Sequence, residues 1–431
     1  SSRHSSSNST SLWIAGRMNG GSAHRQRLLL MTANVGSLFE EGQRLQDTWL
    51  DVISEKILLE EADLSVIHMQ ETGGKRYVEC SGQVPLLIEK LADRIASQYS
   101  FCRAFLDLNY TSPAYTALGS IFFVRKDAFT LVHQFDFVRK QFMALPTNNS
   151  VEFRVDGLDN EPLAVKRKFP KHFWPAIKWG RKGYLHTRWL VGGKILDLIN
   201  VHLFHDESNL ALIHENPSLY SSNRKRALDY VINACMLDND EDARINRFIF
   251  GDLNFRLDSR TFLNRLTGPA EPHPLEDHTQ HGSQDFLKDG LVPLRNDINT
   301  SDLRRTVSAI EFRREDGEPN ENCVLRIEKK RFDYFNHVKL LAEWESYLQD
   351  DKEVDNFPEL FEMPITFPPT YPWSEDPLDS GVFMKTRAPA WCDRVLMNKT
   401  AYESKNTAQY ESIGRQTCMG DHKPVLLVID L

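Results

Sequence analysis

From Arg27 onward, short apolar runs alternate with amphipathic stretches along the chain, a pattern that predicts strands and helices in turn. The apolar runs are rich in Leu, Val, Ile and Phe, as buried strands are, and fall at 28–34, 64–71, 117–124, 132–138 and up to Gly251. Apolar residues at helical spacing predict helices over 49–60, 84–96 and 222–237. Gly192-Gly193 predicts a hairpin turn between strands at 185–190 and 194–203.

The second half of the chain has a less regular pattern. Residues 265–360 contain a short apolar segment at 286–290, an acidic, Asn-rich loop at 315–322 and a predicted helix over 337–348. A Pro-rich segment at 364–372 then leads to the last two predicted strands. Strands with long amphipathic helices suit two packed sheets with helices outside, an α/β fold.

The domain organisation follows from where the motifs lie. Residues 1–26 are rich in Ser, Asn, Gly and Arg without apolar periodicity, so we expect a disordered leader or a remnant of cloning. Polar motifs spread from Asn34 to His422 predict that 27–431 is a single catalytic domain, with a peripheral elaboration around 265–360.

Composition and charge narrow the functional classes. The 431 residues carry a net charge of −8, which argues against general binding to nucleic acid or to a membrane surface but leaves room for a local anion site. Six dispersed cysteines without a C-x-x-C pair favour a reducing compartment over a disulfide framework or a zinc site. No apolar stretch reaches the roughly 20 residues that span a bilayer, so we expect a soluble, intracellular protein.

Candidate chemistry gathers at the ends of three predicted strands. The segments 248–256, 389–396 and 420–429 each set polar residues beside an apolar run, and together they carry Asp252, Asn254, Asp393, Asp421 and His422. A single segment of this kind would indicate no more than a turn. Three suggest that strand ends converge on a hydrolytic centre.

Hydrolysis of a phosphate ester needs a placed water and neutralised phosphate oxygens, and Mg²⁺ with a few oxygen ligands supplies the latter. Glu71 at its strand end is the first candidate ligand and Asn34 the second. Asp252 and Asn254, two apart, point the same way in extended chain and could hold a water and a phosphate oxygen. A carboxylate such as Asp393 would raise the pKa of His422, and His202 ends another strand.

Each of these residues also has a plainer interpretation. A lone Glu at a strand end is usually solvated, Gly-Asp-x-Asn can be an Asx turn, and a lone His is more often packed with its hydrogen bonds satisfied.

A basic and aromatic stretch at 166–189 holds eight Lys and Arg and no acidic residue. Nucleic-acid binding is one interpretation; a solvated face is preferred for 166–171, and substrate binding for the residues around Lys182. A P-loop, a Ser nucleophile and a cysteine phosphatase loop are all lacking.

These motifs together resemble the inositol polyphosphate 5-phosphatase family, within the DNase I-like group. The strongest matches are 251–256 and 389–396, supported by Asn34, 70–71, 181–183, 200–203 and 420–424, so the resemblance covers about 28–431. It implies a four-layer α/β/β/α sandwich with the site at one end of the sheets. Features at 32–39, 202–210 and 367–372 are similar to type I members. Pro372 stands where lipid-acting relatives have a Lys that helps to hold the 4-phosphate.

The resemblance also implies a role for each matching residue. Glu71 would bind Mg²⁺ with Asn34 nearby, and Asp252 would orient the water as base. Asn254 and His202 would contact the scissile phosphate, His422 paired with Asp393 would polarise it, and Asp421 would support this network. The remaining substrate contacts would come from basic and polar residues at Lys182, Arg188, Arg387, Lys423, Asn200 and Arg256.

The implied activity is Mg²⁺-dependent removal of the 5-phosphate from soluble inositol 1,4,5-trisphosphate and the 1,3,4,5-tetrakisphosphate, which ends calcium-mobilising signalling. We expect a cytoplasmic monomer that binds no nucleic acid. Peripheral association with the plasma membrane would need a C-terminal lipid anchor, which the printed sequence does not contain. The alternatives are a phosphodiesterase or nuclease of the same fold and a phosphoinositide-binding pseudoenzyme.

Overall fold

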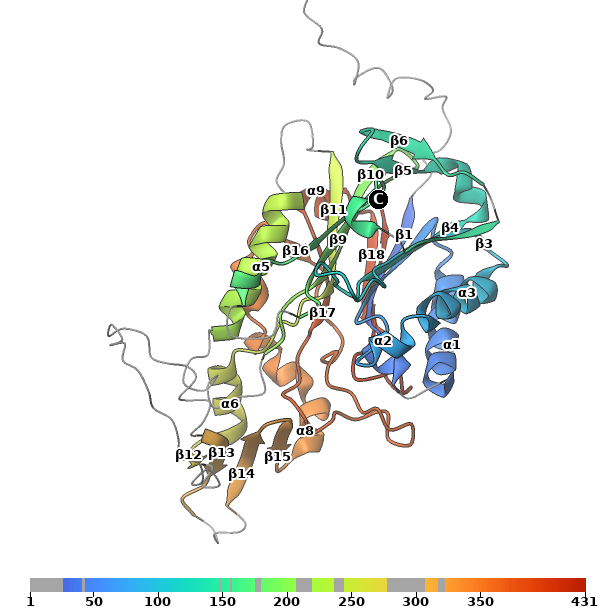
Figure 1. Ribbon diagram of the computed structural model, residues 1–431. Coiled ribbons are helices and arrows are strands. Elements are labelled where there is room, and N and C mark those ends of the chain that lie inside the picture. The colour runs from blue at the N-terminus through green and yellow to red at the C-terminus, as the bar shows by residue number, and fades with distance from the viewer. Residues whose placement is uncertain are drawn as a thin grey trace, which may run out of the picture.

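The apolar runs of the sequence form two large β-sheets that pack face to face in the computed structural model (Figure 1). It describes residues 26–40, 43–147, 149–155, 157–174, 180–206, 219–235, 244–276, 307–316 and 322–431. Residues 1–25 of the leader expected over 1–26, the segment at 286–290 and Trp179 in the basic stretch lie outside these residues.

The first sheet has seven strands among the described residues. In spatial order they are β18 (Thr407–Ser412), β19 (Val425–Asp430), β1 (Arg27–Asn34), β2 (Leu64–Gln70), β4 (Gly119–Arg125), β3 (Tyr99–Leu106) and β7 (Ser150–Arg154). β1 and β2 run parallel, and β19 pairs antiparallel with β1. The carboxyl ends of β1 and β2 therefore meet at one edge of this sheet.

The second sheet contains most of the remaining long strands. Its order is β16 (Phe361–Glu362), β17 (Asp393–Met397), β11 (Ile245–Asp252), β10 (Lys194–His202), β9 (Gly183–Val191), β5 (Val132–Asp136) and β6 (Gln141–Ala144), and β8 (Val165–Lys168) pairs with β9. β10 and β11 are parallel. The expected hairpin joins β9 to β10, where Gly192 and Gly193 both adopt the positive φ of a primed turn.

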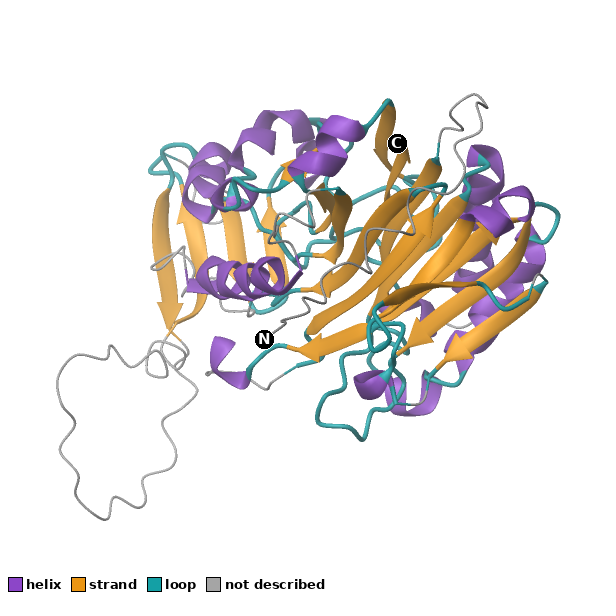
Figure 2. Cartoon of the chain, turned by 90° about the horizontal axis from the view of Figure 1, so that it is seen from above, coloured by secondary structure: helices purple, strands orange, loops and turns teal. Residues whose placement is uncertain are grey.

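Three apolar cores explain why these strands are apolar on both faces. Leu28 and Leu30 of β1 belong to the core that also holds Leu196, Leu198 and Phe248 of the second sheet. Leu29 and Met31, which alternate with them, face α1 (Gln43–Glu60) and α3 (Gln83–Ile95). Ile199 and Val201 of β10 face α5 (Leu219–Cys235). Helices thus cover the outer face of each sheet, giving the expected four-layer α/β/β/α sandwich of the DNase I-like group (Figures 1 and 2).

A third, four-stranded sheet lies at one end of the sandwich, where the sequence suggested only irregular chain (Figure 2). It consists of β12 (Glu271–Glu276), β13 (Val307–Arg313), β14 (Cys323–Glu328) and β15 (Arg331–Tyr334). Its apolar residues, among them Ile310 and Leu325, join the buried cluster that lies between the two large sheets. The short helices α6 (Ser259–Thr267) and α8 (His337–Ala342) lie nearby, and α2 (Tyr77–Cys80) and α9 (Lys399–Ser404) flank the two large sheets.

Several expectations need correction. The helix expected over 337–348 is α8 followed by a 3₁₀ helix at Trp344–Asp350. The 3₁₀ spacing aligns Trp344 with Tyr347, and both rings pack on Trp391. Lys166, expected on a solvated face, is buried, with its ammonium 2.8 Å from Asp107 and 3.0 Å from Asp159.

Candidate active site

Strand register brings the polar strand ends of the second sheet together. His202, the last residue of β10, is the partner of Asp252 at the end of β11. Asp252 is in turn the partner of Asp393, the first residue of β17. Three residues that are up to 191 positions apart in the chain are therefore neighbours on adjacent strands.

Asp252 connects this row to the first sheet. Its Oδ2 accepts a hydrogen bond from Asn34 Nδ2 at 3.0 Å, and Asn34 ends β1. The Asn34 Oδ1 accepts from the Gly36 backbone N–H at 3.1 Å, which fixes the amide. The Asp252 Oδ1 accepts from the Asn254 backbone N–H at 3.0 Å. The carboxylate is 1% exposed, so these donors replace its water.

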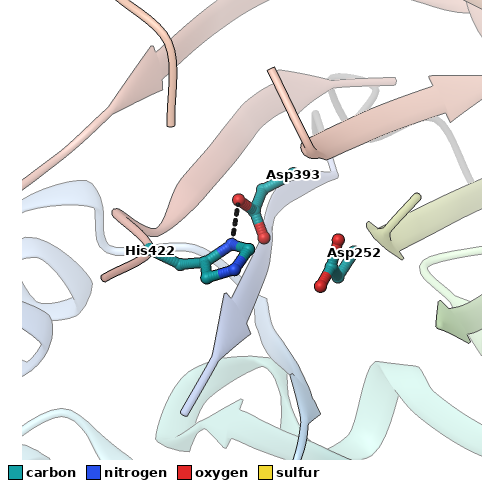
Figure 3. A group of neighbouring side chains, drawn as sticks. All are labelled: Asp252, Asp393 and His422. Atoms are coloured by element: carbon teal, nitrogen blue, oxygen red, sulfur yellow. Dashed lines mark hydrogen bonds and ion pairs between the residues drawn. The ribbon is translucent and has the colours of Figure 1, made fainter. Parts of the chain in front are cut away.

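His422 and Asp393 form the second part of the site (Figure 3). His422 Nδ1 lies 2.8 Å from Asp393 Oδ2, and the imidazole faces Asp252. Burial alone would lower the pKa of His422, but the Asp393 and Asp252 carboxylates outweigh it and raise the pKa to about 10. The imidazole is therefore a cation at neutral pH, with its Nδ1–H donated to Asp393.

Glu71 lies just beyond the end of β2, and its carboxylate is near His202, which also contacts Asp252. Burial would raise its pKa, but His202, Lys182 and Arg181 together lower the pKa to about 2. The nearest cationic atoms are still distant, with His202 Nε2 at 3.7 Å and Arg181 at 3.9 Å. Within the described chain, Glu71 is therefore an ionised carboxylate whose oxygens have no close hydrogen-bond donor.

Lys182 and His202 line the same end of the site. Lys182 is 6% exposed, and its ammonium contacts Nε2 of His202. Burial lowers the pKa of Lys182 to about 8, against the opposing effect of Glu71 and Asp252. Burial and Lys182 also lower the pKa of His202, against the opposing effect of Asp252 and Glu71. His202 Nε2 is 3.3 Å from Asp252.

Sequence comparison with known proteins agrees with this geometry. The chain is 53% identical over 412 residues to the "Probable type I inositol 1,4,5-trisphosphate 5-phosphatase" of Caenorhabditis elegans, covering 94% of this chain and 99% of the relative. The chain belongs to the inositol polyphosphate 5-phosphatase family. It is also 37% identical over 411 residues to inositol polyphosphate-5-phosphatase A of Rattus norvegicus, covering 93% of this chain and 92% of that protein. This is a family of hydrolases.

Other comparisons are more distant. Residues 311–428 match the family model described as Endonuclease/Exonuclease/phosphatase family 2. Among solved structures, the chain is similar to the inositol polyphosphate 5-phosphatase domain of SpSynaptojanin in complex with inositol (1,4)-bisphosphate and calcium ion. The two share 14% sequence identity, with a TM-score of 0.47. The match covers 94% of this chain and 84% of that one.

Not every expected site residue of this 5-phosphatase reaches the cluster. Asn200 is fully buried, and its side chain links the two sheets. It donates to the Met69 and Gly119 carbonyls and accepts from Gln70. Arg188 pairs with Asp197 at 2.7 Å. Arg188 is five residues along β9 from Gly183, which is the partner of His202 at the end of the strand nearest the site. Both side chains therefore lie outside the cluster and contact other protein groups.

Three other expected residues lie at its margin. Asp421 accepts from Ser37 Oγ at 3.0 Å. Lys423 is 1% exposed and directs its ammonium to the Thr417 carbonyl, with the Trp373 ring 5.1 Å away. Arg387 lines a small pocket together with Arg256. The Arg387 side chain is half-buried at this pocket.

Asn254 and Arg256 extend the site of the 5-phosphatase toward that pocket. Asn254 Nδ2 donates to the Leu203 carbonyl at 3.0 Å, and its Oδ1 accepts from Arg256 at 2.9 Å. The Arg256 guanidinium lies over the Tyr371 ring at 5.0 Å, and that ring packs against His422 at 4.7 Å. Asn254 is thus already engaged on both sides of its amide.

The donor set indicates where a hard cation fits. Asp252, Asp393 and His422 present possible ligand atoms within 4.8 Å of one another. A protonated imidazole cannot bind a metal, so at neutral pH this group is a proton-carrying network. Glu71 fits better, because its ionised oxygens lack close donors. A Cβ on Gly36 would lie 2.9 Å from Glu71 Oε2 and 3.3 Å from Asn34 Oδ1, so these two oxygens border the same small space.

Sequence reasoning left some contacts of the site unassigned. Arg181 was expected among the basic substrate candidates around Lys182, and the structure adds that it stacks over Tyr77 at 4.8 Å and lies 3.9 Å from Glu71. Thr370 and Tyr371 of the Pro-rich segment contact Asp393 and His422 respectively. The position of this segment just before 389–396 in the chain was the available signal.

Proposed function

We propose that this chain is a Mg²⁺-dependent phosphomonoesterase that removes the 5-phosphate from soluble inositol 1,4,5-trisphosphate and inositol 1,3,4,5-tetrakisphosphate, and so ends calcium-mobilising signalling. The 53% identity over nearly the full length of both chains to the C. elegans protein carries this proposal, because that protein's name includes the trisphosphate substrate. Glu71, Asp252, Asp393 and His422 supply the residue types that such a reaction needs.

Glu71, with Asn34, would hold the Mg²⁺. When bound, the ion would neutralise phosphate oxygens and the charge that develops on the leaving oxygen. Lys182, Arg256 and Arg387 would contribute further positive charge toward the phosphates. A small cluster of cations in a chain of net charge −8 suits a small soluble polyanion better than duplex DNA.

Asp252 and His422 would act on the two sides of the scissile bond. Asp252 is ionised and fixed by Asn34 and Asn254, so it would orient the attacking water as a hydrogen-bond acceptor. His422 faces it as a cation and would donate a hydrogen bond to a phosphate oxygen. His202 would contact the same phosphate beside Lys182.

We place the protein in the cytoplasm, as a monomer. Its six cysteines are free thiols, which suits a reducing compartment. No helix among the described residues is both long and apolar enough to cross a bilayer.

Phosphate release from inositol 1,4,5-trisphosphate, measured with Mg²⁺ and with excess chelator, tests the proposal. We expect release that the chelator abolishes and that fresh Mg²⁺ restores. Release that is indifferent to chelator, or none at all, would contradict it. Nicking of supercoiled plasmid at a comparable rate would instead favour a nuclease of the same fold.

Glu71→Gln tests the assignment of the metal ligand. Removing the charge keeps the shape, so we expect the Mg²⁺ concentration for half-maximal activity to rise by about tenfold or more. Glu79→Gln is the matched control, because Glu79 is exposed on α2 and pairs only with Arg76. An unchanged Mg²⁺ dependence in Glu71→Gln would remove Glu71 from the metal site.

A further inference from the structure

Thr370, in the Pro-rich segment at 364–372, contacts both motifs that build the His422–Asp393 pair. Its backbone N–H donates to the Ala390 carbonyl at 3.1 Å, and Tyr371 forms a β-bridge with Ala390. Its carbonyl accepts from the Lys423 N–H at 2.9 Å. Thr370 is fully buried, so this segment clamps the chain just before Asp393 to the chain just after His422.

The direction of the Thr370 hydroxyl is fixed by its own hydrogen bonds. The oxygen accepts from the backbone N–H groups of Cys392 at 3.2 Å and Asp393 at 3.3 Å. A hydroxyl has one hydrogen and two lone pairs, so both lone pairs are then occupied. The hydrogen is left for Asp393 Oδ2, which lies 2.7 Å away.

Asp393 Oδ2 is also the oxygen that accepts from His422 Nδ1. The other oxygen, Oδ1, is buried and has no hydrogen-bond partner among the described residues. Two donors therefore converge on one oxygen, and nothing on Oδ1 opposes rotation of the carboxylate. Thr370 supplies the second point that stops this rotation, since a single hydrogen bond from His422 leaves the carboxylate free to turn.

We propose that Thr370 is a positioning residue of the reaction, whose hydroxyl holds the Asp393 carboxylate in the orientation that binds and aims His422 at the phosphate. The inference rests on the proposed function. The Pro-rich segment would then take part in the reaction through Thr370. Thr370 would act through Asp393 and not by contacting the substrate or the metal. Loss of the Thr370 hydroxyl should lower kcat and leave substrate binding unchanged, because the cations proposed to bind phosphate lie on other segments of the chain.

Thr370→Val and Thr370→Ser separate the hydroxyl from the packing. Val keeps the shape and removes the hydroxyl, so we expect kcat to fall about tenfold or more with KM within about twofold. Ser restores the hydroxyl and should recover most of kcat. Thr267→Val, which removes a buried hydroxyl bonded to the Leu263 carbonyl in α6, is the matched control and should keep wild-type kcat.

A double-mutant cycle with Asp393→Ala tests whether Thr370 acts through Asp393. We expect Thr370→Val to change kcat by less than about twofold when Asp393 is absent. An equal loss in both backgrounds, or Thr370→Ser no better than Thr370→Val, would overturn the proposal. Thr370→Ala replaces Val if the Val variant does not fold, as judged by thermal unfolding. An inactive wild-type protein would instead refute the proposed function, so the two failures are distinguishable.

Discussion

Asp252 receives hydrogen bonds or close contacts from three sides, and these set its charge. Asn34 and the Asn254 backbone each donate at 3.0 Å, and His202 lies at 3.3 Å. Burial alone would raise the pKa of Asp252, but His422, His202 and Lys182 hold it far below its ordinary range. A base with so low a pKa serves mainly to orient water, since proton transfer to it is weakly driven.

Asp252→Asn removes this charge and keeps the shape. We expect kcat to fall by about 10² to 10⁴, because the water loses its acceptor, and KM to change little. The measurement is steady-state phosphate release, with exposed Asp355→Asn as the control. Turnover near the wild-type value in Asp252→Asn would show that the base has been assigned to the wrong residue.

Lys182 predicts a pH dependence of substrate capture. Burial lowers its pKa to about 8, so the ammonium loses its charge as the pH rises through that value. We expect kcat/KM to fall above about pH 8, while kcat persists to higher pH because the pKa of His422 is about 10. Lys182→Arg stays charged and should lose the fall near pH 8. A kcat/KM that is flat from pH 7 to 9.5 would exclude Lys182 as a phosphate contact.

The backbone at the site also departs from ordinary geometry. Glu71 and Asn254 both have positive φ, at 56° and 51°. Residues other than glycine rarely adopt this conformation, and it clusters at functional sites. The sequence gives no warning of this at Glu71, because nothing in its neighbours distinguishes a left-handed residue from an extended one.

At the scale of elements, the two sheets are joined by a polar bridge next to the site. Asn200 of β10 accepts from Gln70 of β2 at 2.8 Å and donates to the Met69 and Gly119 carbonyls at 3.1 and 2.9 Å. Asn200 and His202 share a face of β10, with Asn200 roughly 6.6 Å deeper. The closeness of Asn200 to His202 in the sequence suggested a substrate contact. Because Asn200 lies farther from the site end of the strand, its side chain instead links the two sheets.

Asn200→Leu should expose the role of this bridge. It removes the side-chain donor to two buried carbonyls and one of the two acceptors of Gln70 Nε2, which still donates to the His68 carbonyl. Each buried group that loses a partner costs about 1 to 3 kcal/mol, so we expect a loss of about 3 kcal/mol or more in the free energy of unfolding. Denaturant unfolding measures it, and exposed Asn356→Leu is the control. A loss below about 1 kcal/mol would mean that the sheets do not depend on Asn200.

Most strands of the two large sheets that are buried on both faces were predictable, because a continuous apolar run indicates such a strand. β3 was missed although both of its faces are buried, because Ser100 and Arg103 interrupt its apolar run. β13 and β14 were missed although Ile310 and Phe312 alternate with Glu311 and Arg313. That alternation indicates a sheet with one buried face, and its outward charges made the region look like irregular chain.

At the scale of the whole molecule, the site exists because two sheets end at the same place. β1 and β2 bring Asn34 and Glu71, and β10, β11 and β17 bring His202, Asp252 and Asp393. Residue types at strand ends could be predicted from the sequence. Arg188 could also have been excluded, because the two-residue turn predicted at Gly192-Gly193 sets the register that pairs Arg188 with Asp197.

We propose that these converging strand ends hydrolyse one phosphate of a small soluble polyanion. Phosphorus NMR of inositol 1,4,5-trisphosphate incubated with the wild-type chain and Mg²⁺ tests it most directly, since each phosphate has its own resonance. We predict that the 5-phosphate signal disappears, inorganic phosphate appears, and inositol 1,4-bisphosphate accumulates. An unchanged spectrum, or loss of the 1- or 4-phosphate first, would contradict the account.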